Sequence, residues 1–135
     1  MVDTLVAGRV RKTRRTGWLL LGDLLIIALF VGLGELRHGG EVVDWAITFG
    51  EFGLAWVAVA VPMGAYSRGP DRSTRWTVGV IIGSWVIAAT LGWAIRAILE
   101  PFATFSVVFL MVMVGTGLLF LLPWRVLIAP RLLSP

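Results

Sequence analysis

One carboxylate, Asp23, lies well inside the first apolar stretch of the sequence. Asp23 falls about two turns after Gly17, and a charge at this depth of a membrane helix costs roughly 2.5 to 3.5 kcal/mol on insertion scales. We therefore expect its side chain to face other helices rather than lipid. Counting residues from the helix ends places Ser84 and Thr116 near its depth, so either hydroxyl is a predicted hydrogen-bond partner. Asp23 is then either a hydrogen-bonded structural group or a site that couples protons or ions.

A second set of ionisable residues is expected at the opposite ends of the helices. Arg96 approaches this end together with three carboxylates, and we expect it to pair with Glu51 or Glu35. The functional interpretation is an entrance for an ion or a substrate. In the structural alternative, Arg96 tethers a loop while Glu35 and Glu100 reach water. The predicted charge cluster comprises Glu35, His38, Glu51, Arg96 and Glu100.

Metal and enzymatic chemistry have few candidate residues. The chain has one histidine and no cysteine. His38 could titrate near neutral pH or join acidic neighbours around a metal, but a catalytic zinc site normally needs about three protein ligands. No phosphate-binding loop, nucleophile elbow or dinucleotide fingerprint is present. We expect no metal, no cofactor and no enzymatic activity; the enzymatic alternative is a lipid-modifying enzyme that uses His38 and the nearby carboxylates.

Four long apolar stretches must position these residues. Hydrophobic residues make up 58% of the 135 residues and charged residues only 15%, a balance unlike that of a soluble domain. Each stretch has about 20 residues, which as a helix crosses roughly 30 Å of hydrocarbon, and no alternating polarity indicates a β-barrel. The predicted fold is an all-α, polytopic, antiparallel four-helix transmembrane bundle. Its spans are about 17–36, 46–66, 77–99 and 103–122, after a basic segment 1–16 and before a short tail 123–135.

Basic and aromatic residues predict the orientation of this bundle. Ten of the 12 lysines and arginines fall on one side, and basic residues in short loops mark the cytoplasmic side. Both termini are therefore expected in the cytoplasm of a multi-pass cell-membrane protein. Aromatic rings favour the headgroup level. The predicted anchors at the cytoplasmic interface are Trp18, Tyr66, Trp76, Trp124 and Arg125.

Small residues on the third and fourth stretches favour close contacts between helices. Such contacts can lie within one chain or between chains. The residues concerned are Gly79 and Gly83, the row Ser84, Ala88 and Gly92, and Gly115, Thr116 and Gly117. Trp56 and Trp85 lie in the middle of their spans, where we expect them to pack between helices, with ligand stacking as the alternative.

Short motifs spread in order over nearly the whole chain carry a family resemblance. They are Gly22-Asp23-Leu24, Phe30, Gly34, His38, Phe52, Trp56, Gly64-Ala65-Tyr66, Arg96, Pro101-Phe102 and Trp124-Arg125. In these residues the sequence resembles a family of small four-span membrane proteins of unknown function from halophilic archaea and actinobacteria. The resemblance implies the architecture and marks Asp23, His38, Tyr66 and Arg96 for testing, but it implies no reaction. Glu51 departs from the family pattern, which tends to place proline before the phenylalanine.

Two functions of different classes are compatible with these features. The first is a non-enzymatic membrane component: a subunit, assembly factor or stabilising factor that packs against a membrane partner or itself within the lipid bilayer. The alternative is a small proton- or cation-coupled transporter or channel that uses Asp23 and the acidic rim. The strong basic bias disfavours an antiparallel dual-topology dimer. Nucleic-acid binding is not expected, because the basic residues lie where they set orientation.

Overall fold

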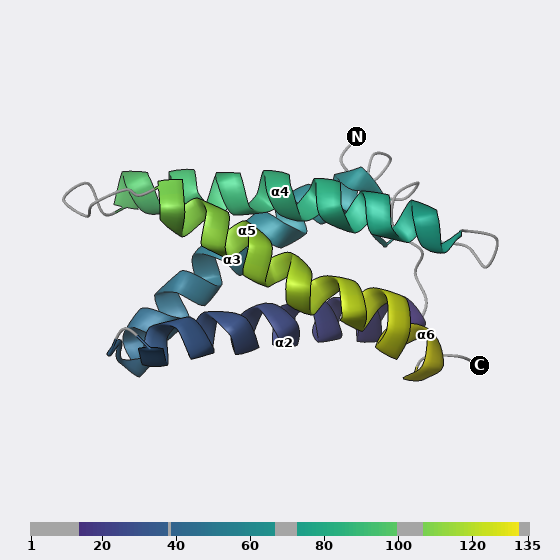
Figure 1. Cartoon of the computed structure of the whole chain (residues 1–135), viewed down its shortest axis with the longest axis horizontal. Coiled ribbons are helices and arrows are strands. Elements are labelled where there is room, and N and C mark those ends of the chain that lie inside the picture. Colours follow the sequence, from purple (N-terminus) through teal and green to yellow (C-terminus); the bar gives the residue numbers. More distant parts are fainter. Residues whose placement is uncertain (1–13, 38, 67–72, 100–106, 133–135) are drawn as a thin grey trace.

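The computed structural model describes residues 14–37, 39–66, 73–99 and 107–132 (Figure 1). Each of the four stretches forms a helix that is long and apolar enough to cross a membrane. The helices are α2 (Arg14–Arg37), α3 (Val42–Met63), α4 (Thr74–Leu99) and α5 (Val107–Pro123), and α5 continues through the π-helical turn η1 (Trp124–Ile128) into α6 (Ala129–Leu132). The prediction of an all-α, multi-pass membrane protein is confirmed.

The helices form an antiparallel bundle in which each long helix packs against two others. α3 contacts α2 and α4, and α5 contacts the same two helices. In Figure 1, α2 and α4 form the two long edges and α5 crosses between them. We call the two ends of the bundle the Arg125 end, where α2 and α4 begin, and the Glu35 end, where they finish.

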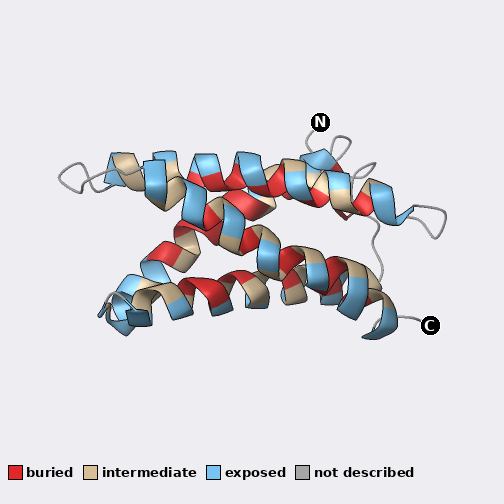
Figure 2. Ribbon diagram, viewed as in Figure 1, coloured by how far each residue is buried: buried red, intermediate tan, exposed pale blue. Residues whose placement is uncertain are grey.

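The buried face of each helix is narrow. Red buried positions in Figure 2 form stripes that point between the helices, while leucines such as Leu25 and Leu119 remain on the outside. In a bilayer these outer leucines meet hydrocarbon, so their exposure carries no hydrophobic penalty. The bundle is therefore held by shape and by polar contacts inside it more than by removal of apolar surface from water.

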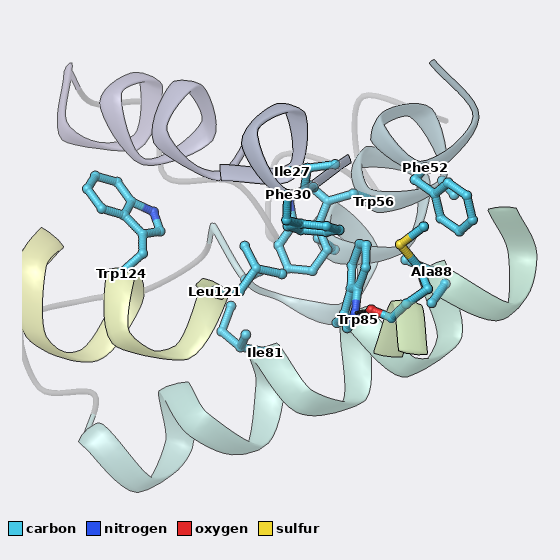
Figure 3. Packing of buried hydrophobic residues seen from close by; sticks show 14 of the residues in the cluster. Ile27, Phe30, Phe52, Trp56, Ile81, Trp85, Ala88, Leu121 and Trp124 are labelled. Carbon is cyan, nitrogen blue, oxygen red and sulfur yellow. Dashed lines mark hydrogen bonds between the residues drawn. The ribbon is translucent and has the colours of Figure 1, made fainter. Parts of the chain in front are cut away.

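Trp85 lies at the centre of the core (Figure 3). Its ring meets Phe30 edge-to-face at 5.5 Å and an interplanar angle of 86°, and it lies 6.1 Å from the ring of Trp56. Its indole N–H donates to the backbone oxygen of Met113 at 3.1 Å. The ring also covers Gly117, where an added Cβ would overlap the indole. The predicted packing role of Trp56 and Trp85, both fully buried, is confirmed.

α3 ends earlier than predicted. The expected span reaches residue 66, but the helix stops at Met63 because Gly64 adopts a left-handed conformation with φ of 92°. Glycine takes this conformation without the steric cost of a Cβ, and a left-handed residue commonly ends a helix. The Ala65 N–H then donates to the Ala60 oxygen at 3.0 Å. This turn directs Tyr66 back toward the bundle, where it is buried.

The fourth span ends later than predicted. A tail was expected from residue 123, yet the chain stays helical through Leu132. Pro123 has no N–H to donate to the preceding turn, and the chain widens into η1, where the Ala129 N–H bonds to the Trp124 oxygen five residues back. The predicted start at 103 lies outside the described residues. α2 and α4 begin at Arg14 and Thr74, slightly before the predicted 17 and 77.

Candidate functional site

Asp23 is the centre of a buried polar cluster at the Arg125 end. Its Oδ1 accepts hydrogen bonds from Trp124 Nε1 and Arg125 Nε, both at 2.9 Å. Its Oδ2 accepts from Arg125 Nη2 at 2.6 Å and from the Tyr66 hydroxyl at 2.5 Å. Each carboxylate oxygen thus holds two donors, and the guanidinium binds through a two-pronged contact that also neutralises the charge. With Trp56, these residues form the Asp23 cluster.

Tyr66 and Arg125 are fixed in turn by further contacts. Trp56 Nε1 donates to the Tyr66 oxygen at 2.8 Å, and Arg125 Nη1 donates to the Ala65 backbone oxygen at 3.1 Å. The guanidinium carbon lies 5.0 Å from the centre of the Tyr66 ring, within range of a cation–π interaction. Burial, followed by the charge of Asp23, raises the pKa of the Tyr66 phenol above its ordinary value. The phenol therefore stays protonated and acts as a donor to Asp23.

Two local features bring α2 and η1 together. Gly22 lies beneath the Trp124 ring, and an added Cβ there would overlap the indole. A π-helical turn has more residues per turn than an α-helix, so successive side chains diverge less around its axis. Trp124 and Arg125, which are adjacent in η1, consequently both reach Asp23.

The hydrogen-bond partners predicted for Asp23 are wrong. Ser84 is buried, but its hydroxyl has no hydrogen-bond partner among the described residues, and Thr116 is half-buried on α5. All four donors to Asp23 come from Tyr66, Trp124 and Arg125 instead. Neither predicted partner lies at the depth of Asp23. Thr116 precedes Trp124, which bonds to Asp23, by eight residues or about 12 Å of helix. Trp85, the neighbour of Ser84, packs against Phe30, about two turns beyond Asp23 on α2.

Three of the predicted interface anchors also need correction. Tyr66, Trp124 and Arg125 point into the bundle, with 3%, 9% and 2% of their surface exposed, instead of toward lipid headgroups. A buried ionised Asp23 attracts the nearest cation and the nearest N–H and O–H donors, which competes with their preference for the interface. Trp18 is 52% exposed and Trp76 is half-buried, so these two remain available at the Arg125 end.

A second polar cluster lies toward the Glu35 end. Arg96 Nη1 lies 3.6 Å from Glu51 Oε2 and donates to the Thr48 hydroxyl oxygen at 3.0 Å. The Thr48 hydroxyl donates to Glu35 Oε1, also at 3.0 Å. The predicted pairing of Arg96 with Glu51 is confirmed. Thr48, which links both acidic residues through Arg96, was missed because a lone threonine in an apolar stretch carries no distinctive pattern.

Two further residues belong to the predicted charge cluster. His38 and Glu100 lie outside the described residues. Within the described part of the chain, no three His, Cys, Asp or Glu side chains are grouped as metal ligands would be. The structure thus joins Glu35, Glu51 and Arg96 of the predicted set and adds Thr48 to it.

Aromatic rings fill the bundle between the two clusters. Arg96 lies over the Phe109 ring at 5.5 Å, and Phe109 contacts Phe52 at 6.2 Å. Phe52 contacts Trp85 at 6.4 Å, and Trp85 contacts Trp56, a member of the Asp23 cluster. The two clusters are therefore connected by packed aromatic rings.

Comparison with known proteins gives a family. No curated protein and no solved structure matches the chain significantly. One family model, described as a protein of unknown function (DUF3054), matches residues 20–128. This range includes every residue of both polar clusters, from Asp23 to Arg125. The match covers most of the chain, which therefore belongs to the DUF3054 family.

Proposed function

We propose that this protein is a non-enzymatic membrane component that packs against a membrane partner or a second copy of itself, with its Arg125 end in the cytoplasm. The observation that carries the proposal is the use of Asp23. The one carboxylate placed deep in α2 accepts four internal hydrogen bonds, two of them from the Arg125 guanidinium, and so ties α2 to the Gly64–Tyr66 turn and to η1. In this proposal, Asp23 has a structural role.

The surroundings of Asp23 favour the same interpretation. A residue that couples transport must exchange its proton or ion with solvent or substrate. The hollow next to Arg125, bordered by Thr77 and Pro130, has a volume of about 10 Å³, which is close to the space of one water molecule. It offers no room for a substrate beside the ion pair.

Open glycines on the outer surface support contact with another helix. An added Cβ at Gly79 of α4 or at Gly115 of α5 would meet nothing within 4 Å, in contrast to Gly117, which is covered by Trp85. Membrane helices associate where small residues allow their backbones to approach. Within the described ranges, Gly79 and Gly115 serve no such approach, so they are suited to a contact with a second chain.

The test is isolation of the tagged protein in native lipid particles without detergent. We expect it to carry a second membrane protein, or a second copy, in fixed stoichiometry. Gly79→Leu and Gly115→Leu should lower the recovered partner without lowering the protein's own unfolding temperature. Ala58→Leu, at an exposed position of α3, is the matched control and should retain the partner. Recovery of a solitary monomer from native membranes would refute the proposal.

A proton- or cation-coupled transporter is the second candidate, and Glu51 rather than Asp23 favours it. Glu51 lies about two and a half turns into α3 with its side chain 3% exposed, while its partner Arg96 is 25% exposed. A carboxylate at this depth paired with a cation open to one side resembles a half-channel. In proteoliposomes containing a pH-sensitive dye, Glu51→Gln should abolish cation-dependent proton flux. Absence of flux in the wild type with sodium, potassium and lithium would exclude this candidate.

A further inference from the structure

A cavity of about 220 Å³ lies between the last turn of α2 and the first turn of α3, at the Glu35 end. Its accessible walls are almost wholly apolar, and two of the residues that line it are acidic. The lining residues are Gly32, Glu35, Leu36, Gly40, Glu41, Val42 and Trp45. An apolar cavity with a few converging polar groups is the usual form of a small-ligand site.

Glu35 is the more buried of the two acidic residues that line this cavity. Its Oε1 is engaged by the Thr48 hydroxyl at 3.0 Å. Its Oε2 lies close over Gly40, where an added Cβ would overlap it, and receives no hydrogen bond from any residue in the described ranges. Glu41 adds a second negative charge while accepting the backbone N–H of Asp44 in the capping box of α3. The cavity therefore attracts a cation that can donate hydrogen bonds.

Trp45 contributes an aromatic surface rather than a donor. Its indole N–H is already bonded to the Ala28 backbone oxygen at 2.9 Å. Its ring is stacked on Phe49, with centres 6.2 Å apart and planes inclined by 21°. A tryptophan ring with its N–H satisfied elsewhere offers its negative π face, which attracts ammonium groups. An anion would meet repulsion from Glu35 and Glu41 and no available donor on Trp45.

The size and rim of the cavity indicate how a ligand would enter. Leu36 and Val42, on its rim, are 76% and 75% exposed, so the opening is bordered by surface suited to lipid. Sites for whole drug-sized ligands have roughly 300 to 1,000 Å³. The smaller volume here matches a headgroup and its first methylenes, with the remaining hydrocarbon left in the bilayer.

We propose that this cavity binds the ammonium group of a lipophilic amine. The nitrogen lies between Glu35 Oε2 and the Trp45 ring, and the hydrocarbon tail extends past Leu36 and Val42 into lipid. An aminophospholipid headgroup and a free long-chain amine share this chemistry. The site is independent of the partner contact proposed above, because it lies between α2 and α3, whereas Gly79 and Gly115 lie on α4 and α5.

The test follows the indole N–H signal of Trp45 by NMR in dodecyl maltoside micelles, with the signal assigned through Trp45→Phe. Dodecylammonium should shift it saturably, whereas dodecanol and dodecyl sulfate should not. Glu35→Gln keeps the shape of the side chain, which can still accept the hydrogen bond from Thr48. The loss of its negative charge should weaken the binding of dodecylammonium about tenfold. Val43→Ala, at an exposed position of the same turn of α3 that does not line the cavity, is the control and should leave the affinity unchanged.

An equal response to dodecanol or dodecyl sulfate, or unchanged affinity in Glu35→Gln, would overturn the proposal. Nanodiscs identify the source of the ligand. If phosphatidylethanolamine nanodiscs produce the shift and reduce the response to dodecylammonium, the ligand is a lipid headgroup. If the shift requires dodecylammonium in nanodiscs of either phosphatidylethanolamine or phosphatidylglycerol, the ligand is a free amine.

Discussion

Both members of the Asp23–Arg125 ion pair are buried, with side chains 0% and 2% exposed. Removing each ion from water costs several kcal/mol, and the mutual attraction offsets this cost only when the remaining donors and acceptors are satisfied. Here Tyr66, Trp124 and the Ala65 oxygen supply those contacts. The loss of both partners should therefore cost much less than the sum of the two single losses.

We expect Asp23→Asn and Arg125→Met each to lower the free energy of unfolding by about 3 to 5 kcal/mol, because each leaves an unpaired buried group. The double variant Asp23→Asn/Arg125→Met should lose much less than the sum. Unfolding in mixed dodecyl sulfate and dodecyl maltoside micelles, followed by circular dichroism, measures these values. Arg131→Met, on the exposed end of α6, is the control and should change little. Additive losses would show that the pair is not coupled.

Tyr66 is the single tyrosine of the chain, so its ionisation can be observed directly. Burial and Asp23 raise its pKa in the folded state, so folded Tyr66 retains its proton more tightly than unfolded Tyr66. The stability gained in this way is present below the ordinary pKa of about 10 and is lost as pH rises above it. We expect the tyrosinate absorbance band to appear only with unfolding. A reversible titration near pH 10 in the folded protein would contradict this.

At the scale of elements, α2 and η1 approach each other closely only because Gly22 has no side chain. The Trp124 ring occupies the space that a Cβ would take, and from there its N–H reaches Asp23. Helix approach and hydrogen bonding are thus parts of one contact. A group as small as a methyl at position 22 must displace the indole, the hydrogen bond, or both.

Gly22→Ala should accordingly lower the free energy of unfolding by about 1 to 3 kcal/mol through overpacking. Gly34→Ala on the same helix is the matched control, because an added Cβ at Gly34 meets nothing within 4 Å. Alanine favours helix over glycine by up to about 1 kcal/mol, so the control should be neutral or slightly more stable. Thermal unfolding in dodecyl maltoside compares the two. Equal unfolding temperatures for the two variants would mean that α2 and η1 can move apart with little loss of stability.

The contacts of the Asp23 cluster illustrate where sequence reasoning succeeded and where it stopped. The inward orientation of Asp23 followed from the cost of a charge in lipid, and Asp23 is indeed buried. The partners did not follow, because they depend on the left-handed Gly64 that turns Tyr66 inward and on the π turn at Trp124. One signal was available: a buried acid needs a cation, and Arg125 directly follows an apolar stretch at the same end of the bundle.

At the scale of the whole molecule, the number and order of helices were predictable because lipid imposes a minimum length on every apolar span. Arg96 and Glu51 were also predictable as partners, since few charges exist to pair at the Glu35 end. The residues at which the spans begin and end were less predictable. The fourth span was expected to end at residue 122, but the chain stays helical through Leu132, and Trp124 and Arg125 in this extension bond to Asp23.

Orientation in the membrane can be tested with single cysteines, since the natural chain has none. Val43 at the start of α3 and Leu132 at the end of α6 are exposed aliphatic residues at opposite ends. Basic residues at the Arg125 end predict that this end is cytoplasmic. A membrane-impermeant maleimide should label Val43→Cys in intact cells and Leu132→Cys only after permeabilisation. The reverse pattern would invert the proposed orientation.

The ion pair that closes the bundle joins residues 102 positions apart in the chain. Synthesis proceeds from the N-terminus, so α2 enters the membrane well before Arg125 exists. Throughout the production of α3 and α4, Asp23 is an uncompensated acid in hydrocarbon, a costly intermediate. The last helix brings both Arg125, which pairs with Asp23, and Trp124, which donates to it. A chain that terminates before Trp124 therefore lacks the cation that offsets the cost of burying Asp23, so the first helix depends on the last for a stable place in the bundle.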